Sequence, residues 1–399
     1  MFKFIHTSDW HLGQNFYGYD RGEEQHDFLQ QLADIARKHT PDALLVSGDI
    51  FHTAAPSNAA FNMYVEGMLN IHKACPTMAI IVIAGNHDSA SRLDSDSRLW
   101  ELAGVRVLGG IARNEEGIAD LDRHIIPVGD KGIVAAVPFA YPTNYPKVGT
   151  GDIERDQRQQ AYFQALLDQA NSTNPDQLPV VLMAHLAVNH SDFKGHDLNM
   201  MMECVQIGTL GDDYDYAALG HIHRPQDVSE RARYCGTPVA VSFDEQCEHS
   251  VSIVTIDSHG AKPIVETKRI KNIKPLHTIP ADEPVTLEKA LELVEEHNDI
   301  RNAYIRLNVL VDRFLPSGAL EHSASVVSGK NGRFCEIKKT SKAIAGGPVH
   351  QMTVEEFNSK QPIEVAAQYI LENTGTPMTD QEIEMFNYVY QLVQEESRQ

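Results

Sequence analysis

The sequence lacks the cysteine pattern of a disulfide-bonded or thiolate-zinc protein. Its 399 residues include five cysteines, and none of them forms a CxxC pair. An odd number of scattered cysteines argues against both a disulfide framework and a Cys₄ zinc site. No apolar run approaches the ~18 residues that span a bilayer, and "MFKFIHTSDW" does not have the pattern of a signal peptide. We therefore expect a cytoplasmic protein with reduced cysteines.

Basic residues are also scarce. Lysine and arginine number 34 against 55 aspartates and glutamates, which gives a formal net charge of -21. A protein that binds nucleic acid through phosphates usually has a basic surface. Any such binding by this chain must therefore be local, mediated by metal ions, or shared with a partner.

Apolar runs in the first 225 residues stop abruptly at clusters of Gly, Asp, Asn and His. The runs are "DALLVSGDIFH", "MAIIVIAGNHD", "VVLMAHLAV" and "YAALGHIHRP". Runs of this length predict buried strands, and a helical spacing such as that of Phe28, Leu32 and Ile35 separates the early ones. The alternation predicts an α/β fold, in which ligands bind at the carboxyl ends of the strands.

Two breaks divide the chain. The first is marked by Pro275, Pro280 and Pro284. Beyond it, Thr286 is expected to cap a helix, and the alternation over residues 305–311 predicts a half-buried strand, so a small α+β domain follows. The second break is "AIAGGPVHQ". The expected parts are residues 1–274, 275–347 and 348–399.

The last part is acidic and helical in pattern. Thr353 with Glu356 and Thr379 with Glu382 each fit the S/T-x-x-E capping box. Residues 353–399 contain nine acidic and two basic residues. Two amphipathic acidic helices are expected to bind a protein partner, with packing onto the first domain as the alternative.

The polar clusters contain seven oxygen and nitrogen donors and no sulfur. These donors suit two hard or borderline divalent cations, and the carboxylate of Asp49 could bridge both. Two such cations and two aspartates leave a charge of about +2, which would attract a phosphate. The donors are Asp9, His11, Asp49, Asn86, His185, His221 and His223.

A second group of residues could act on the substrate. His87 follows the ligand Asn86 and precedes Asp88, whose carboxylate could fix the tautomer of the imidazole. A histidine held in this way could donate a proton to a leaving oxygen. Taken singly, D-x-H and "SGDIF" are also common in turns, whereas "GNHD" and "GHIH" are more specific. All of them in order after apolar runs indicate two-metal phosphoester hydrolysis.

These motifs resemble the signature of the calcineurin-like metallophosphoesterases. Their surroundings, "HTSDWHLGQNFYG", "GDIFHTAAPS", "GNHDSASRL", "ALGHIHRPQ" and "RYCGTPVAVSFDE", resemble the SbcD family of nuclease subunits. The resemblance is strong to about residue 250 and weaker beyond it. It implies a four-layer αββα sandwich of two sheets, a capping domain, and C-terminal helices that bind the coiled-coil base of an SMC-like ATPase, SbcC.

The resemblance also implies roles for single residues. His87 would be the catalytic histidine beside Asp88, and His52 would position the scissile phosphate, with an ordinary surface residue as the alternative. Asn15 and Arg92 are further expected substrate contacts. The expected metal is manganese. One ion would take Asp9, His11, Asp49 and His223, and the other Asp49, Asn86, His185 and His221.

Three functions follow as hypotheses. The first is a Mn²⁺-dependent DNA nuclease, 3' to 5' on duplex ends and endonucleolytic on single strands or hairpins, which works with the ATPase at the nucleoid in repair, replication and recombination. The second is a phosphoesterase for small or protein substrates; "GDIFHTAAP" lacks the arginine typical of protein phosphatases. The third is a non-catalytic scaffold. Such a protein would be expected to have lost metal ligands, but all seven are present in this sequence.

Two further features bear on partners. Residues 303–345 contain seven basic and three acidic residues, which suits a long polyanion. By resemblance, residues 16–27 and 57–69 would supply helices to a homodimer within a heterotetramer, with an internal packing face as the alternative.

Overall fold

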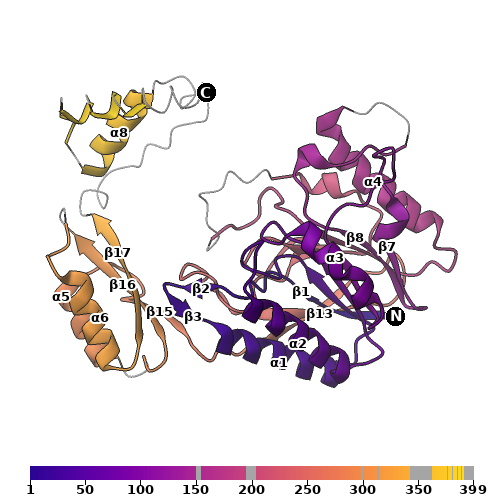
Figure 1. Cartoon of the computed structure of the whole chain (residues 1–399), viewed down its shortest axis with the longest axis horizontal. Coiled ribbons are helices and arrows are strands. Elements are labelled where there is room, and N and C mark those ends of the chain that lie inside the picture. The colour runs from indigo at the N-terminus through magenta and orange to yellow at the C-terminus, as the bar shows by residue number, and fades with distance from the viewer. Residues whose placement is uncertain are drawn as a thin grey trace. The chain divides into compact units, whose positions relative to one another are not determined.

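The chain folds into two compact units in this computed structural model, residues 1–274 and 275–399 (Figure 1). The structure describes residues 1–149, 154–194, 204–297, 300–311, 314–341, 362–374, 376–379, 381–383, 385–387 and 389–390.

The first unit contains two six-stranded sheets. The first sheet has the order β14-β13-β1-β4-β5-β6, in which β1, β4, β5 and β6 are parallel and β13 and β14 are antiparallel to their neighbours. Its inner strands are apolar runs because both faces are buried. The strands are β1 (Phe2–Thr7), β4 (Ala43–Ser47), β5 (Ala79–Ile83), β6 (Val105–Leu108), β13 (Ser250–Ile256) and β14 (Ile264–Arg269).

The second sheet has the order β11-β12-β10-β9-β8-β7, in which β12, β10, β9 and β8 are parallel. Parallel neighbours place the carboxyl ends of β9 and β10 at the same edge of the sheet. The strands are β7 (Ile125–Val128), β8 (Gly132–Val137), β9 (Val180–His185), β10 (Tyr216–Gly220), β11 (Gln226–Ser229) and β12 (Ala232–Tyr234). A small hairpin joins β2 (Asn15–Phe16) and β3 (Tyr19–Asp20).

Helices cover the outer face of each sheet and complete four layers. Helices α1 (Gly22–His39) and α2 (Asn58–Ala74) pack on the first sheet, with α3 (Ala90–Glu101) beside them (Figure 1). Helix α4 (Arg158–Ser172) packs on the second sheet. A third apolar cluster, which includes Phe4, Leu45, Met183 and Tyr216, lies between the sheets. The αββα sandwich expected from the sequence is confirmed.

The 3₁₀ helices of this unit are η1 (Leu121–His124), η2 (Pro142–Asn144), η3 (Arg155–Gln157) and η4 (Ile207–Leu210).

The second unit begins with a three-stranded parallel sheet and two helices. The cap expected at Thr286 is confirmed, because its side chain accepts a hydrogen bond from the Lys289 N–H. The expectation of a half-buried β16 was wrong. This strand lies between the other two, and Arg306 and Asn308 on it are only 3% and 6% exposed. The elements are β15 (Leu276–Ile279), α5 (Leu287–Glu296), β16 (Tyr304–Val311), α6 (Ala319–Gly329) and β17 (Arg333–Ser341).

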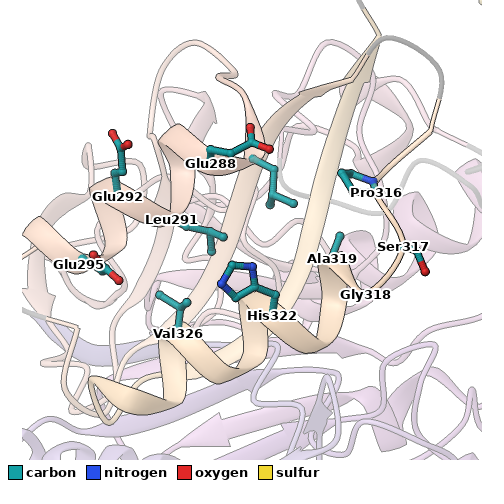
Figure 2. A pocket seen from close by; sticks show the side chains of 11 residues that line it. Glu288, Leu291, Glu292, Glu295, Pro316, Ser317, Gly318, Ala319, His322 and Val326 are labelled. Carbon is teal, nitrogen blue, oxygen red and sulfur yellow. The ribbon is translucent and has the colours of Figure 1, made fainter.

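A groove runs between α5 and α6, and Figure 2 shows its lining. Leu291, Ala319 and Val326 form an apolar floor. Its rim includes three glutamates of α5, Glu288, Glu292 and Glu295. Of these, Glu292 is paired with Lys289 of the same helix at 2.9 Å.

The C-terminal residues that the structure describes include α8 (Pro362–Thr374). The second expected capping box is confirmed: the Glu382 N–H donates to Thr379 Oγ1 at 3.3 Å, and the Thr379 N–H donates to Glu382 Oε2 at 2.7 Å. The box at Thr353 and Glu356 and the domain boundary at 347/348 lie outside the described residues. No helix within the described ranges is long and apolar enough to cross a membrane.

Candidate metal centre

All seven proposed ligands lie at or just after the carboxyl ends of five strands. Asp9 and His11 follow β1, Asp49 follows β4, and Asn86 follows β5, so the first sheet supplies four ligands. The second sheet supplies three, because His185 ends β9 while His221 and His223 follow β10. Parallel strands therefore deliver both groups to the corresponding edges of the two sheets.

Backbone strain is concentrated among these ligands. Asp9, His11, Asp49 and His221 all have positive φ, with values of 54°, 45°, 52° and 101°. Non-glycine residues rarely adopt this region, and such strain persists where the surrounding structure fixes it for a function. The backbone thus turns sharply after β1, β4 and β10, where these four ligands lie.

Two glycines allow the ligand loops to approach one another. A Cβ on Gly85 would lie 2.1 Å from Asp49 Oδ1, and a Cβ on Gly48, which has φ of 93°, would lie 2.2 Å from His185 Nδ1. Either contact is shorter than atoms tolerate. Glycine is therefore required in "SGD" and "GNHD" for the loops to pack around the ligands.

The first ligand group consists of Asp9, His11 and His223, whose donor atoms all lie within 4.8 Å of one another. All three residues are buried. His11 Nε2 lies 3.3 Å from His223 Nε2 and 3.8 Å from Asp49 Oδ2. Two ring nitrogens this close can share one proton or ligate one cation.

The second ligand group consists of Asp49, His185 and His221, again with donor atoms within 4.8 Å. His185 Nε2 lies 3.4 Å from Asp49 Oδ2 and 3.0 Å from Asn86 Oδ1, which adds the fourth expected ligand. Asp49 Oδ2 is thus near His11 on one side and His185 on the other. This is the position that a bridging carboxylate requires.

The orientation of the imidazoles is set by hydrogen bonds on their far side. His185 Nδ1–H donates to the Ser47 carbonyl at 2.8 Å, and His223 Nδ1–H donates to Glu245 Oε1 at 3.1 Å. Each bond leaves Nε2 as the ring nitrogen that faces the other ligands. Partners of this kind commonly orient metal-ligating histidines.

Charges within the cluster shift its pKa values strongly. Burial lowers the pKa of His185, but Asp49 and Asp9 outweigh that effect and raise it to about 9. Burial raises the pKa of Asp49, yet His185 and His11 hold it well below its usual range. For His11, burial dominates and the pKa falls well below the ordinary value. Close ionisable groups with opposed shifts are typical of functional sites.

His87 lies beside the ligands without being one of the seven. Its backbone N–H donates to Asp49 Oδ1 at 2.8 Å, and its Nδ1–H donates to the His52 carbonyl at 2.9 Å. Its ring centroid is 4.9 Å from that of His11. The His52 ring stacks on it at 5.8 Å, and burial lowers the pKa of His52.

Asp88 has different contacts from those expected. Its carboxylate accepts hydrogen bonds from the backbone N–H groups of Ile50, Phe51 and Gly85, at 3.1, 2.9 and 2.8 Å. The tautomer of His87 is instead set by the carbonyl of His52. Burial, followed by the charge of Asp49, raises the pKa of Asp88 to about 7. Asp88 therefore joins the two ligand loops.

Asn15 and Arg92, the two further residues expected to contact the substrate, are not bonded to this cluster. Asn15 is exposed on β2 and Arg92 is exposed on α3. Among the hydrogen bonds and ion pairs of the described residues, neither side chain contacts a ligand. Sequence reasoning missed Glu245, which binds His223. Glu245 is the last residue of "RYCGTPVAVSFDE", a segment that contributes to the SbcD resemblance but whose local pattern does not point to His223.

The donor set fits two divalent cations. It combines four imidazoles, two carboxylates and one amide oxygen, arranged in two groups around Asp49. Such donors suit Mn²⁺, Fe²⁺, Co²⁺ or Zn²⁺. The 3.3 Å approach of His11 Nε2 to His223 Nε2 agrees with a cation between them.

The comparison with protein families agrees with this site. A family model described as calcineurin-like phosphoesterase matches residues 2–225, which is more than half of the chain. The chain therefore belongs to the calcineurin-like phosphoesterase family. Its fold and site define it as a metal-dependent phosphoesterase.

Curated relatives place the resemblance more closely. The SbcD subunit of nuclease SbcCD from Escherichia coli strain K12 is 30% identical over 335 residues, which cover 78% of this chain and 79% of the relative. The SbcD subunit from Rhodobacter capsulatus is 32% identical over 276 residues, 65% and 68% of the two chains. The one from Bacillus subtilis is 28% identical over 327 residues, 77% and 79%. The resemblance to the SbcD family is confirmed.

Proposed function

We propose that this chain is the nuclease subunit of a DNA-processing complex and hydrolyses DNA phosphodiesters with two divalent cations, most suitably Mn²⁺. The observation that carries the proposal is the arrangement of two donor groups around Asp49 with His87 beside them. The relatives, which are named as SbcD subunits of nuclease SbcCD, support DNA as the substrate.

Each cation has a defined set of residues in this proposal. When bound, the cations supply Lewis acidity toward the phosphate oxygens and lower the pKa of an attacking water. Asp49 would contribute to both. The remaining ligands of one ion would be Asp9, His11 and His223, and those of the other would be Asn86, His185 and His221.

His87 is the proposed catalytic residue. Because its Nδ1–H is held by the His52 carbonyl, Nε2 is the atom that carries or releases a proton. In the protonated form, Nε2–H would donate to the leaving 3' or 5' oxygen of the scissile bond. His52 supports this role through its carbonyl, and its ring, stacked on His87, is proposed to position the scissile phosphate.

The acidic chain is compatible with a DNA substrate if the cations and a partner hold the phosphates. The helix side of the second unit is acidic at Glu288, Glu292 and Glu295. Its basic residues include exposed Lys338 and Lys339 on β17, whereas Arg306 is buried and paired with Glu336 at 3.7 Å. We propose that the second unit caps the substrate through β17 and that an SbcC-type ATPase supplies most of the DNA-binding surface.

The finer features are those that the resemblance to the SbcD family implies. We propose 3' to 5' cleavage of duplex ends and endonucleolytic cleavage of single strands and hairpins, during DNA repair, replication and recombination in the cytoplasm. The C-terminal acidic helices would bind the coiled-coil base of the ATPase, and residues 16–27 and 57–69 would pair two copies in a heterotetramer.

The test is an assay of nucleotide release from end-labelled linear duplex DNA. The purified chain with Mn²⁺ is compared with an EDTA control and with His87→Ala, with the matching ATPase present and absent. We expect release that requires metal and falls roughly 10²- to 10⁴-fold in the variant, the range typical of a lost general acid. His72→Ala, which alters a half-buried histidine of α2, should keep full activity. Intact DNA under all conditions, with hydrolysis of a small phosphoester, would favour a small-substrate phosphoesterase.

A further inference from the structure

A buried carboxylate contacts the outer nitrogen of one metal ligand. Glu245 has a fully buried side chain, and its Oε1 accepts the hydrogen bond from His223 Nδ1–H at 3.1 Å. It lies in the loop after β12 and before β13. A buried carboxylate is costly unless it is hydrogen-bonded.

The other contacts of Glu245 fix the position of its carboxylate. Thr237 Oγ1–H donates to Glu245 Oε2 at 2.7 Å, and the Val241 N–H lies 3.3 Å from both oxygens. The Thr237 N–H also donates to the His223 carbonyl at 3.0 Å. His249 Nδ1 lies 2.8 Å from the Thr237 carbonyl. The backbone and the ring of His223 are therefore held by the same loop.

This loop is also held in place by two residues from the first part of the sequence. Arg21, which is fully buried, donates to the Ala240 carbonyl, and Gln14 Nε2 donates to the Val241 carbonyl at 3.0 Å. Gly236 has φ of 75°, and a Cβ there would lie 2.5 Å from the His223 carbonyl oxygen. The loop is thus closely packed on His223, and a shift of Glu245 would be transmitted to the imidazole.

We propose that Glu245 is a positioning residue that orients the His223 imidazole and makes its Nε2 a stronger metal ligand. This inference rests on the proposed two-metal function and adds a residue that the ligand motifs do not contain. A carboxylate that accepts the Nδ1–H fixes the ring tautomer and increases the electron density at Nε2. The effect should be confined to the cation held by Asp9, His11, Asp49 and His223.

The experiment measures Mn²⁺ binding to the full chain by calorimetry and by electron paramagnetic resonance, without DNA. In Glu245→Gln, which keeps the size of the side chain and removes its charge, we expect one of two sites to weaken roughly 10- to 100-fold. The other site should stay within about threefold, and the spectrum of a coupled Mn²⁺ pair should give way to that of a single ion. Glu248→Gln, which alters an exposed glutamate paired with Arg269, is the matched control and should bind as wild type.

Thermal melting without metal shows whether the variant is folded. If Glu245→Gln does not fold, Thr237→Val carries the test, because it removes only the hydroxyl that holds the carboxylate and should weaken the same site by a smaller factor. Wild-type binding at both sites in a folded variant, or equal weakening of both sites, would overturn the positioning role. Failure of the unaltered chain to bind Mn²⁺ would instead refute the proposed function itself.

Discussion

At the scale of single residues, the site depends on how closely the ligand loops approach. Gly85 allows the loop after β5 to contact Asp49, and any side chain there would displace the carboxylate of Asp49. The geometry of the ligand cluster therefore depends on this glycine.

Substitution of Gly85 by alanine tests this dependence. The new Cβ would lie 2.1 Å from Asp49 Oδ1 and 2.3 Å from Asp49 N, so backbone must move. We expect the free energy of unfolding to fall by about 1–3 kcal/mol, as overpacking usually costs, and Mn²⁺ affinity to fall at least roughly tenfold. Chemical denaturation and calorimetry measure both. Gly208→Ala is the control, because its Cβ would meet nothing within 4 Å. Unaltered metal binding in Gly85→Ala would show that the loops tolerate a wider separation.

The seven ligands could be proposed from the sequence because each one follows a recognisable strand. The signal that identifies Asp49 or His185 is local, since the apolar run and the polar residue are adjacent. Glu245 is 22 positions from His223, and Asp88 bonds to backbone groups of a different loop, so neither relation appears in any local pattern. Contacts between distant loops are decided by tertiary packing.

At the scale of elements, His6 on β1 links the two sheets. It is fully buried, with Nδ1 3.0 Å from Tyr216 Oη and Nε2 3.2 Å from the Leu219 carbonyl, both on β10. Burial, aided by the charge of Arg233, lowers its pKa from 6.5 to about 3. A neutral histidine is therefore part of the packing between the sheets.

The low pKa of His6 predicts sensitivity to acid. Below pH 6.5 the His6 side chain binds a proton in the unfolded chain, whereas in the folded chain it binds one only when the pH nears 3. The contribution of His6 to stability is therefore intact above pH 6.5 and falls as the pH is lowered from 6.5 toward 3. Between pH 7 and 4.5 the loss from this residue should be about 2–3 kcal/mol. His6→Gln should be less stable at pH 7 but should lose less on acidification. Urea unfolding at a series of pH values measures this, with His72→Gln as control. Equal slopes for His6→Gln and the unaltered chain would contradict the assignment.

The sequence pattern predicted the buried strands of the first unit better than it predicted the burial of β16. Strands β4, β5, β9 and β10 were found because buried parallel strands are continuous apolar runs. The pattern predicted strand β16 correctly but predicted its burial wrongly. Alternation of apolar and polar residues normally indicates one exposed face. In the fold, Arg306 donates to Thr278 Oγ1 at 3.1 Å and Asn308 donates to the Asp282 carbonyl at 3.2 Å. These partners lie on other segments, and they allow polar residues to be buried.

At the scale of the whole molecule, a net charge of -21 opposes association with DNA. Cations bound at the proposed site would attract the DNA phosphates and so reverse this repulsion locally. DNA binding by the isolated chain should then depend on metal.

Anisotropy of labelled duplex DNA tests this dependence in the His87→Ala variant, which should leave the DNA intact. We expect EDTA to weaken binding at least roughly tenfold, and added salt to weaken what remains. Addition of the ATPase should restore tight binding. Affinity that is the same with and without EDTA would mean that a basic surface, rather than the metal centre, holds the phosphates.

Seven side chains from the two sheets are proposed to hold two cations around Asp49. Anomalous diffraction from crystals soaked in Mn²⁺ tests this proposal most directly. We expect two peaks ~3.5–4 Å apart. One should lie among Asp9, His11 and His223, and the other among Asn86, His185 and His221. A single peak, or peaks away from these side chains, would contradict it.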